Sequence, residues 1–432
     1  MTDSQARKPP VHVAMLGARM HYAVPLLFAR AGQLGTFYTD IYLGNKPVLC
    51  RLLVAASSVS DRPSFQRLLG KACLGIPREK VVSFDGMGVR TRWLLRRART
   101  TADVDRVHAS TNREFCERVV ARGLRGAGAI YGFNGASLEI FRAARQNGAF
   151  CFLEQTIAPK RVENQLLKEE GERWSGWEPG LGFAADNGPL DAREEAEWKL
   201  ANCLLCPSDF VARGLQECGV SPSKTVTVPY GVEVPSTNGA RDRTRDGPVR
   251  VLFAGQVCLR KGVPYLLRAL SMLGSSRIQC RLVGELVLDR RRLAEFGRWV
   301  EIVGPAPRSR MPEFFRWADV LVFPSLCEGS ATVTYEAIAS GVPVITTDNA
   351  GSVVRDGVEG FIVPIRDAGA VARRLEQLAT DRSLLADMSQ AALQRSREFT
   401  LERYGGRLLQ VIGPYLSPQL SAAGRTSPSQ YS

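Results

Sequence analysis

The strongest restriction on the fold of this chain is a strand, loop and helix alternation that recurs along most of its length. A short apolar run at residues 11–16 leads through a glycine turn into an apolar-periodic stretch at 23–31, as expected for a strand, a tight turn and a helix. The pattern returns at residues 129–146 and 203–218. Such alternation predicts parallel sheets covered by helices.

One segment divides this series in two. Residues 236–248 are rich in Gly, Asp, Arg, Ser and Thr and carry few apolar side chains, which indicates a linker. A second strand and helix series starts at residue 249, and 432 residues are more than one typical core holds. We expect an N-terminal domain at 1–235, a linker at 236–248, a C-terminal domain at 249–400, a helix at 401–416 and a disordered tail at 417–432.

The stretch from Glu154 to Glu197 is harder to interpret. Strand signals are few, and Trp174, Trp177 and Trp198 lie in it or beside it. We expect long loops and irregular helices there.

Composition indicates a globular protein without a membrane span. Hydrophobic residues make up 45% of the chain and charged residues 23%. The most apolar candidate for a span, residues 47–58, is interrupted by Arg51 and falls short of the roughly 20 residues that cross a bilayer. The first ten residues lack the apolar run of a secretory signal. We expect a cytoplasmic protein.

The cysteines do not indicate a metal site. Ten are scattered along the chain. Cys203 and Cys206 form a CxxC pair, but no second pair at zinc-finger spacing accompanies it. With three histidines in the chain, we expect reduced thiols, no metal and no cofactor.

A net charge of +14, from 57 basic and 43 acidic residues, favours an anionic partner: nucleotide phosphates, acidic lipid headgroups or nucleic acid. The densest basic patch interleaves arginines with Trp93, and its members are Arg90, Arg92, Arg96, Arg97 and Arg99. The patch is either a solvated helix face or a peripheral contact with the inner membrane face. No nucleic-acid motif accompanies it, so we expect no nucleic-acid partner.

Two loops carry residues that could bind a ligand or take part in a reaction. In residues 324–337 a strand gives way to small residues and then to a helix, whose free N–H groups attract phosphate or sugar oxygens. Glu328 in the loop and Glu336 in the helix can accept hydroxyl hydrogen bonds from one polyol. The alternative makes Glu328 a helix-capping acid and Glu336 an exposed helix residue.

The second loop, residues 255–262, follows the first strand of the second series and precedes a helix. Arg260 offers a bidentate fork and Lys261 a point charge, and the two are suited to a diphosphate. The alternative is a basic turn without a ligand.

Several segments together resemble the retaining glycosyltransferases of family 4. They are residues 207–210 with 228–232, the loop 255–262, two glutamates with seven residues between them at 328 and 336, residues 341–344, and residues 356–364. The resemblance covers about residues 200–400 in the family's order. It implies the α/β GT-B fold, in which two Rossmann-like domains with parallel sheets face a central cleft and a C-terminal helix crosses back to the N-terminal domain.

The resemblance also implies roles for these residues. Arg260 and Lys261 would bind the donor diphosphate and stabilise the leaving nucleotide, Glu328 would contact hydroxyls of the transferred sugar, and Glu336 would hold the ribose. Glu328, Arg260 and Lys261 are the catalytic candidates. Backbone groups that would support sugar and phosphate belong to Gly329, Ser330, Ala331 and Thr332.

The chain departs from the family in two places. Gln256 stands where many members have arginine, and the strand that often ends in a histidine here ends in Glu154 and Gln155. These two residues become candidates for acceptor or donor contacts. Gly17 and His21, after the first strand, are further candidates for the cleft, with a surface helix position as the alternative for His21.

We therefore expect a metal-independent, retaining hexosyltransferase of polysaccharide biosynthesis. It would take a nucleotide-sugar donor and a glycan, a lipid-linked glycan or a small molecule as acceptor. The alternatives are a GT-B-like phosphorylase or epimerase, and a non-catalytic protein that binds lipid or nucleic acid. The four charged residues Arg260, Lys261, Glu328 and Glu336 argue against a mere binding module.

Overall fold

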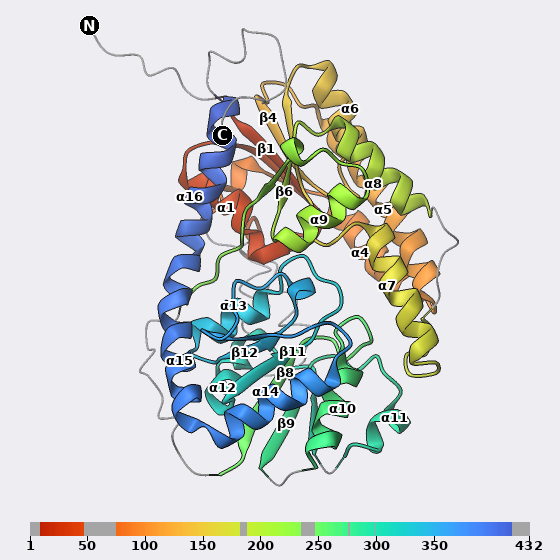
Figure 1. Cartoon of the computed structure of the whole chain (residues 1–432). Helices are drawn as coiled ribbons and strands as arrows, with labels where there is room; N and C mark the ends of the chain where they lie inside the picture. The colour runs from red at the N-terminus through yellow and green to blue at the C-terminus, as the bar shows by residue number, and fades with distance from the viewer. Residues whose placement is uncertain are drawn as a thin grey trace, which may run out of the picture.

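The computed structural model describes residues 9–46, 75–181, 188–234, 247–274, 277–297 and 299–416. The apolar run at 47–58, most of the linker and the tail at 417–432 lie outside these ranges. The described residues form two lobes, each built on one parallel sheet (Figure 1). Within these ranges no helix combines the length and apolarity needed to cross a bilayer.

The first lobe contains a seven-stranded parallel sheet in the order β3-β2-β1-β4-β5-β6-β7. Its strands are β1 (Val11–Met15), β2 (Leu34–Thr39), β3 (Val81–Ser83), β4 (Ala129–Phe133), β5 (Phe150–Glu154), β6 (Cys203–Cys206) and β7 (Thr225–Thr227). Its helices are α1 (Ala23–Arg30), α4 (Asp85–Leu95), α5 (Thr101–Arg122), α6 (Leu138–Gln146), α7 (Lys160–Arg173), α8 (Pro189–Leu200) and α9 (Asp209–Glu217). The central strands β1 and β4 are buried throughout, because helices cover both faces of a parallel sheet.

The second lobe contains a six-stranded parallel sheet in the order β10-β9-β8-β11-β12-β13. Its strands are β8 (Val249–Ala254), β9 (Ile278–Val283), β10 (Val300–Gly304), β11 (Val320–Phe323), β12 (Val344–Thr346) and β13 (Gly360–Ile362). Its helices are α10 (Val263–Leu273), α11 (Arg290–Ala294), α12 (Met311–Trp317), α13 (Thr332–Ala339), α14 (Ala368–Thr380) and α15 (Arg382–Ser396).

Both sheets reverse their strand order next to their first strand, between β1 and β4 in one and between β8 and β11 in the other. This is the doubly wound Rossmann order, and the expectation of two Rossmann-like sheets is confirmed. Open sheets of this kind bind ligands outside the carboxyl ends of their strands at the reversal. The loops that follow β1, β4, β8 and β11 are therefore the places to look for a site.

The last helix, α16 (Leu401–Ile412), begins and ends where the apolar periodicity of the sequence does. It runs beside the first lobe, whereas α15 runs beside the second (Figure 1). Tyr404, Leu408 and Ile412 enter the core of the first lobe with residues of α1, and a Cβ on Gly405 would stand 2.6 Å from Leu27. The end of the chain thus ties the two lobes together.

The expectation of long loops and irregular helices at residues 154–197 is wrong in one respect, because the helices of that stretch are regular. They are α7 and α8, and residues 182–187 between them lie outside the described ranges. Charged residues on most sides of α7 hide its helical period. Beyond α7, Trp174 and Trp177 pack in the core of the second lobe, and the Trp174 indole donates to the Tyr265 hydroxyl at 3.1 Å. This segment is a second tie between the lobes.

Candidate functional site

The loop between β8 and α10 lies against the end of β11. Gly262 begins α10 in the left-handed region, with φ 67°, and a Cβ there would stand 1.9 Å from the carbonyl oxygen of Pro324. Only glycine fits a backbone approach this close. The packing brings Arg260 and Lys261 to the residues that follow β11.

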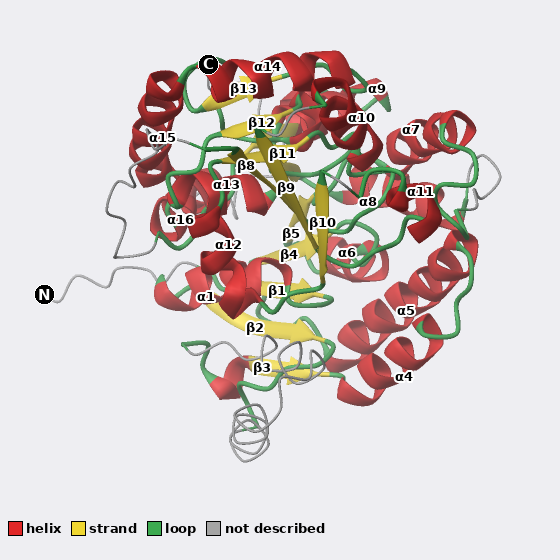
Figure 2. Cartoon of the chain, turned by 90° about the horizontal axis from the view of Figure 1, so that it is seen from below, coloured by secondary structure: helices red, strands yellow, loops and turns green. Residues whose placement is uncertain are grey.

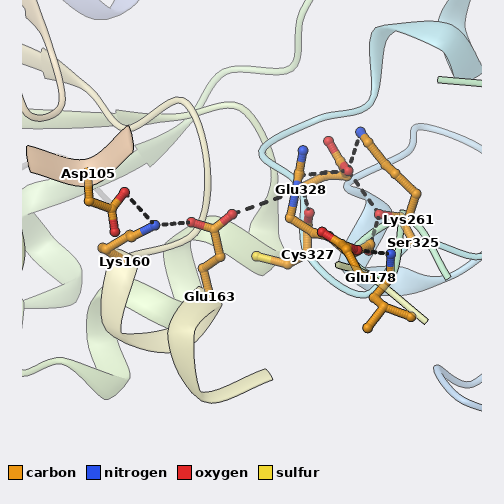
Figure 3. Close-up of polar contacts among 10 residues, drawn as sticks. Asp105, Lys160, Glu163, Glu178, Lys261, Ser325, Cys327 and Glu328 are labelled. Carbon is orange, nitrogen blue, oxygen red and sulfur yellow. Dashed lines mark hydrogen bonds and ion pairs between the residues drawn. The ribbon is translucent and has the colours of Figure 1, made fainter. Parts of the chain in front are cut away.

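These two cations meet Glu328, and Figure 3 shows Lys261 beside it. Arg260 Nη1 lies 3.0 Å from Glu328 Oε1 and donates to the carbonyl of Cys327 at 2.8 Å. Lys261 Nζ pairs with the same Oε1, and the Ser325 hydroxyl donates to it at 2.9 Å. Three residues that the sequence analysis selected from two separate loops are therefore in direct contact.

Glu328 is 9% exposed, yet its surroundings favour the ionised form. Burial alone would raise the pKa of this carboxyl, but the charges of Lys261 and Arg260 outweigh burial and hold the pKa below its usual value. Burial would likewise lower the pKa of Arg260, and Glu328 and Glu163 instead raise it. The site is a desolvated cluster of fixed charges at neutral pH.

The backbone after Glu328 runs along the boundary between the lobes. A Cβ on Gly329 would stand 1.8 Å from the carbonyl oxygen of Thr156 in the first lobe, and the Ser208 hydroxyl donates to the Gly329 carbonyl. Among the described residues the N–H groups of Gly329 and Ser330 have no hydrogen-bond partner. They precede Thr332, where α13 starts, and so form an anion-attracting helix entrance.

The side chains of the same loop serve the fold. The Ser330 hydroxyl donates to the Gly351 carbonyl at 2.7 Å, and the Ala331 N–H donates to the Ala350 carbonyl at 2.9 Å. The Ser330 side chain and the Ala331 N–H are thus bonded within the second lobe.

Glu336 lies on α13 in a different charge environment. Its Oε1 is 3.0 Å from Nη2 of Arg308, and burial raises its pKa although Arg308 opposes this. Arg308 also contacts Nε2 of His21, so His21 links the first lobe to the carboxylate. The sequence analysis missed Arg308, which lies in a short turn after β10 with no motif around it.

His21 does not stand on a regular surface helix. Met20, His21 and Tyr22 all have positive φ, at 43°, 52° and 64°. Non-glycine residues held in this region cost on the order of 1 kcal/mol each and concentrate at functional sites. The contact with Arg308 places His21 at the boundary between the lobes, and its part in a site stays a prediction.

Glu154 and Gln155 do not line a cleft. Both oxygens of Glu154 are occupied, by the hydroxyl of Tyr131 at 2.5 Å and that of Tyr230 at 2.7 Å. Gln155 accepts from Trp198 at 3.0 Å and donates to Ile157 and Glu194. Both side chains are buried. The expectation that they contact a ligand fails because tyrosines and a tryptophan already satisfy their polar atoms.

The first lobe contains a cavity of about 440 Å³ at the carboxyl ends of β1 and β4, walled on its far side by α4 and α5. These two helices lie side by side (Figure 2). Gly17 lines the cavity, as expected of a cleft residue, and its N–H donates to Asp40 at 3.0 Å. The size is that of a small-molecule site.

A chain of ion pairs connects this cavity with the second lobe (Figure 3). Lys160, which lines the cavity, lies 3.5 Å from Asp105 and 3.3 Å from Glu163. Glu163 in turn lies 3.6 Å from Nε of Arg260. The sequence analysis missed Lys160 and Glu163 because it left α7 uninterpreted, and no spacing in α7 marks them.

Glu178 supports the same loop from the far end of the α7 segment. Its Oε2 accepts the N–H of Leu259 at 2.7 Å, one residue before Arg260. Two carboxylates of the 160–178 segment therefore hold the basic loop.

In the part of the chain that the structure describes, no three His, Cys, Asp or Glu side chains are grouped to hold a metal ion. The eight cysteines in that part are all free. Cys203 and Cys206 are buried in β6, where burial holds the pKa of both thiols well above its ordinary value.

Comparison with known proteins agrees with this architecture. Residues 248–381 match the model of the family glycosyl transferases group 1. D-inositol 3-phosphate glycosyltransferase of an Arthrobacter species is 32% identical over 193 residues, which are 40% of this chain and 46% of that protein. The lipopolysaccharide core biosynthesis glycosyltransferase LpsE of Rhizobium meliloti is 25% identical over 280 residues, 58% of this chain and 80% of that protein. The chain thus spans about half of the first relative's length.

Among solved structures, Anabaena HepE in complex with UDP and glucose superposes with a TM-score of 0.62 at 14% identity, covering 94% of this chain and 99% of HepE. This likeness concerns the fold of 94% of the chain, whereas the family match concerns the second lobe. Residues 248–381 therefore match the family glycosyl transferases group 1, within a chain that has the GT-B fold.

Proposed function

We propose that this protein is a retaining glycosyltransferase that moves a hexose from a nucleotide-sugar donor to an acceptor held by the first lobe. The observation that carries the proposal is the convergence of Arg260, Lys261 and Glu328 beside the free N–H groups at the start of α13. The group 1 family match covers all of these residues.

The donor diphosphate suits the two cations. Arg260 and Lys261 share the carboxylate of Glu328 in this structure. A diphosphate would supply new anionic partners, which leaves Glu328 to accept hydrogen bonds from sugar hydroxyls. HepE, solved with UDP and glucose, supports a nucleotide-sugar donor. Glu336 is our candidate for the ribose.

The transfer step needs charge stabilisation on the leaving nucleotide. The bond from the anomeric carbon to the diphosphate oxygen breaks, the acceptor oxygen bonds to that carbon, and the acceptor proton passes to the leaving diphosphate. Arg260, Lys261 and the entrance of α13 can stabilise the developing charge from a desolvated position. We therefore keep the proposal that the reaction needs no metal or other cofactor. Retention follows from the resemblance to family 4.

The acceptor would bind in the cavity of the first lobe. The similarity to LpsE, a lipopolysaccharide core biosynthesis glycosyltransferase, supports a role in polysaccharide biosynthesis with a glycan, lipid-linked or small-molecule acceptor. Thr156 and Ile157 support the placement, because Ile157 lines the cavity while the carbonyl of Thr156 touches Gly329.

A peripheral membrane contact is part of the proposal. Val89 and Trp93 on α4 are 62% and 49% exposed, one helical turn apart, and the guanidinium of Arg97 lies 3.6 Å from the Trp93 ring centroid. The helix ends at Leu95, so Arg96 and Arg97 stand in the turn after it. Replacing Arg96 and Arg97 by Glu should abolish sedimentation with anionic vesicles, and unchanged binding would remove this contact and the inner-membrane location from the proposal.

A thermal-shift panel of UDP, GDP and ADP, with and without EDTA, tests the donor site. One nucleotide at 100 times its Kd should stabilise the protein by about 2.7 kcal/mol. Lys261→Ala should lose most of that gain, and Lys199→Ala, an exposed change on α8, should keep it. If none of the nucleotides stabilises the protein, it does not bind a nucleotide-sugar and the proposal fails.

A further inference from the structure

We propose that the cavity of the first lobe recognises a phosphate group on the acceptor, and that Arg19 and Arg92 hold this group. This inference rests on the proposed function and names the chemical class of the acceptor. It is carried by the balance of paired and unpaired charges on the cavity wall.

The acidic residues of the wall are already occupied. Glu194 accepts from Asn134 at 2.8 Å, from Gln155 at 3.1 Å and from the N–H of Lys160 at 2.8 Å. Asp105 pairs with Lys160. Asp40 accepts the N–H of Gly17. Each of these carboxylates thus already has at least one partner within the protein.

The arginines of the wall are different. Arg19 donates to the Thr156 hydroxyl at 2.7 Å and lies 5.7 Å from the ring centroid of Phe133. Among the described residues neither Arg19 nor Arg92 has a carboxylate partner. His108 also lines the cavity, but burial lowers its pKa and favours the neutral ring. Arg19 and Arg92 are therefore the cations of the wall that have no carboxylate partner among the described residues.

Unpaired guanidinium groups in a concave site are the arrangement that binds phosphate, because the planar fork matches two phosphate oxygens. A neutral sugar would leave both arginines without an anion. The lining also includes the apolar side chains of Leu16, Met87, Leu95 and Leu190. A molecule that joins a phosphate to a less polar body suits both kinds of side chain.

The position of the cavity agrees with an acceptor role. It adjoins the Thr156 and Gly329 contact between the lobes. The ion pairs from Lys160 through Glu163 reach Arg260, so a phosphate near Lys160 changes the charge balance next to the donor loop (Figure 3).

Calorimetric titration of the full chain with glucose 6-phosphate and with glucose tests the inference. The protein is first saturated with whichever of UDP, GDP or ADP stabilises it, so that the donor site is filled. The Kd for glucose 6-phosphate should be at least about tenfold below that for glucose, and Arg19→Gln and Arg92→Gln should each raise it by about tenfold. Arg106→Gln, an exposed change on α5 near His108, is the matched control and should leave it unchanged.

Two results would overturn the inference while the proposed function stands. One is equal affinity for glucose and glucose 6-phosphate in a protein that binds the nucleotide. The other is phosphate binding that Lys261→Ala abolishes and the two arginine variants do not. Loss of nucleotide binding itself would instead count against the proposed function.

A binding experiment with vesicles identifies the source of the phosphate. If phosphatidylglycerol vesicles bind the protein, and both Arg92→Gln and glucose 6-phosphate reduce that binding, the phosphate belongs to a lipid-linked acceptor. Vesicle binding that glucose 6-phosphate does not reduce, beside intact sugar phosphate binding, assigns it to a soluble phosphate ester.

Discussion

Neutralising Glu328 should lower the melting temperature of the protein and enlarge the rise in melting temperature that a nucleotide causes. Glu328→Gln keeps the shape of the side chain but leaves Arg260 and Lys261 without their shared carboxylate. At 3.0 Å, one such pair interacts by about 5 kcal/mol at an effective dielectric constant of about 20. Removing one partner of a buried pair typically costs about 3 kcal/mol or more. We therefore expect a fall in melting temperature of about 6 °C or more.

A nucleoside diphosphate should reverse this loss. Its phosphates would supply the anions that the two cations lack, so the ligand-induced rise in melting temperature should be larger in Glu328→Gln than in the wild type. Sugar transfer should nevertheless be lost, because the variant lacks the carboxylate for the sugar hydroxyls. Thermal melts with and without nucleotide measure both effects.

Glu313→Gln is the matched control for this experiment. Its carboxylate lies 3.2 Å from Arg310, and both side chains are about half exposed, so the change should be worth less than about 1 kcal/mol. The reasoning is refuted if Glu328→Gln melts at the wild-type temperature, or if nucleotide stabilises it less than it stabilises the wild type.

Three further predictions concern the packing around the site. Burial raises the pKa of Glu197 to about 8, so the folded state binds its proton more tightly than the unfolded chain, and this group should lower stability as pH rises from about 4.5 to 8. The melting temperature of Glu197→Gln should fall less over pH 5 to 8 than that of the wild type, and parallel curves would contradict the assignment. Gly329→Ala should force Gly329 away from the Thr156 carbonyl and weaken nucleotide binding, whereas Gly406→Ala, with open space around it, should not; equal nucleotide affinity in the two variants would contradict this. Trp174→Ala should lower the free energy of unfolding by about 3–5 kcal/mol, because the side chain is 4% exposed in the core of the second lobe. A loss below about 1 kcal/mol in denaturant melts would show that the segment after α7 does not hold the two lobes together.

The double-wound fold could be predicted because its strands are short apolar runs followed by loops and periodic helices. β11 is such a run, with four buried residues from Val320 to Phe323. Because helices cover both faces of a parallel sheet, the strand is apolar throughout and does not alternate between apolar and polar residues. The capped helix α16 could be predicted to the residue for a similar reason, since Thr400 caps it and its apolar face is continuous.

The donor cluster could be predicted in part. Arg260, Lys261 and Glu328 all follow strands β8 and β11, which are neighbours in the sheet, so their loops meet at one edge. The partners Glu163 and Arg308 could not be predicted, because they reach the site from α7 and from a turn after β10. Nothing in the local sequence specifies contacts across such separations.

The direction of side chains at the strand ends could not be predicted from the sequence either. Glu154 ends β5 next to the lobe boundary, but its carboxylate accepts from Tyr131 and Tyr230 inside the lobe. The tyrosines come from elements 23 and 76 residues away, and only the folded packing shows that they satisfy this acid.

The most direct test of the account is a crystal structure of the full chain with the nucleoside diphosphate that stabilises it. The account predicts the diphosphate within hydrogen-bonding distance of Arg260, Lys261 and the N–H groups before α13, with Glu328 released from at least one of its cations. A diphosphate bound elsewhere, with the Glu328 cluster unchanged, would contradict the central claim that this cluster is the donor site.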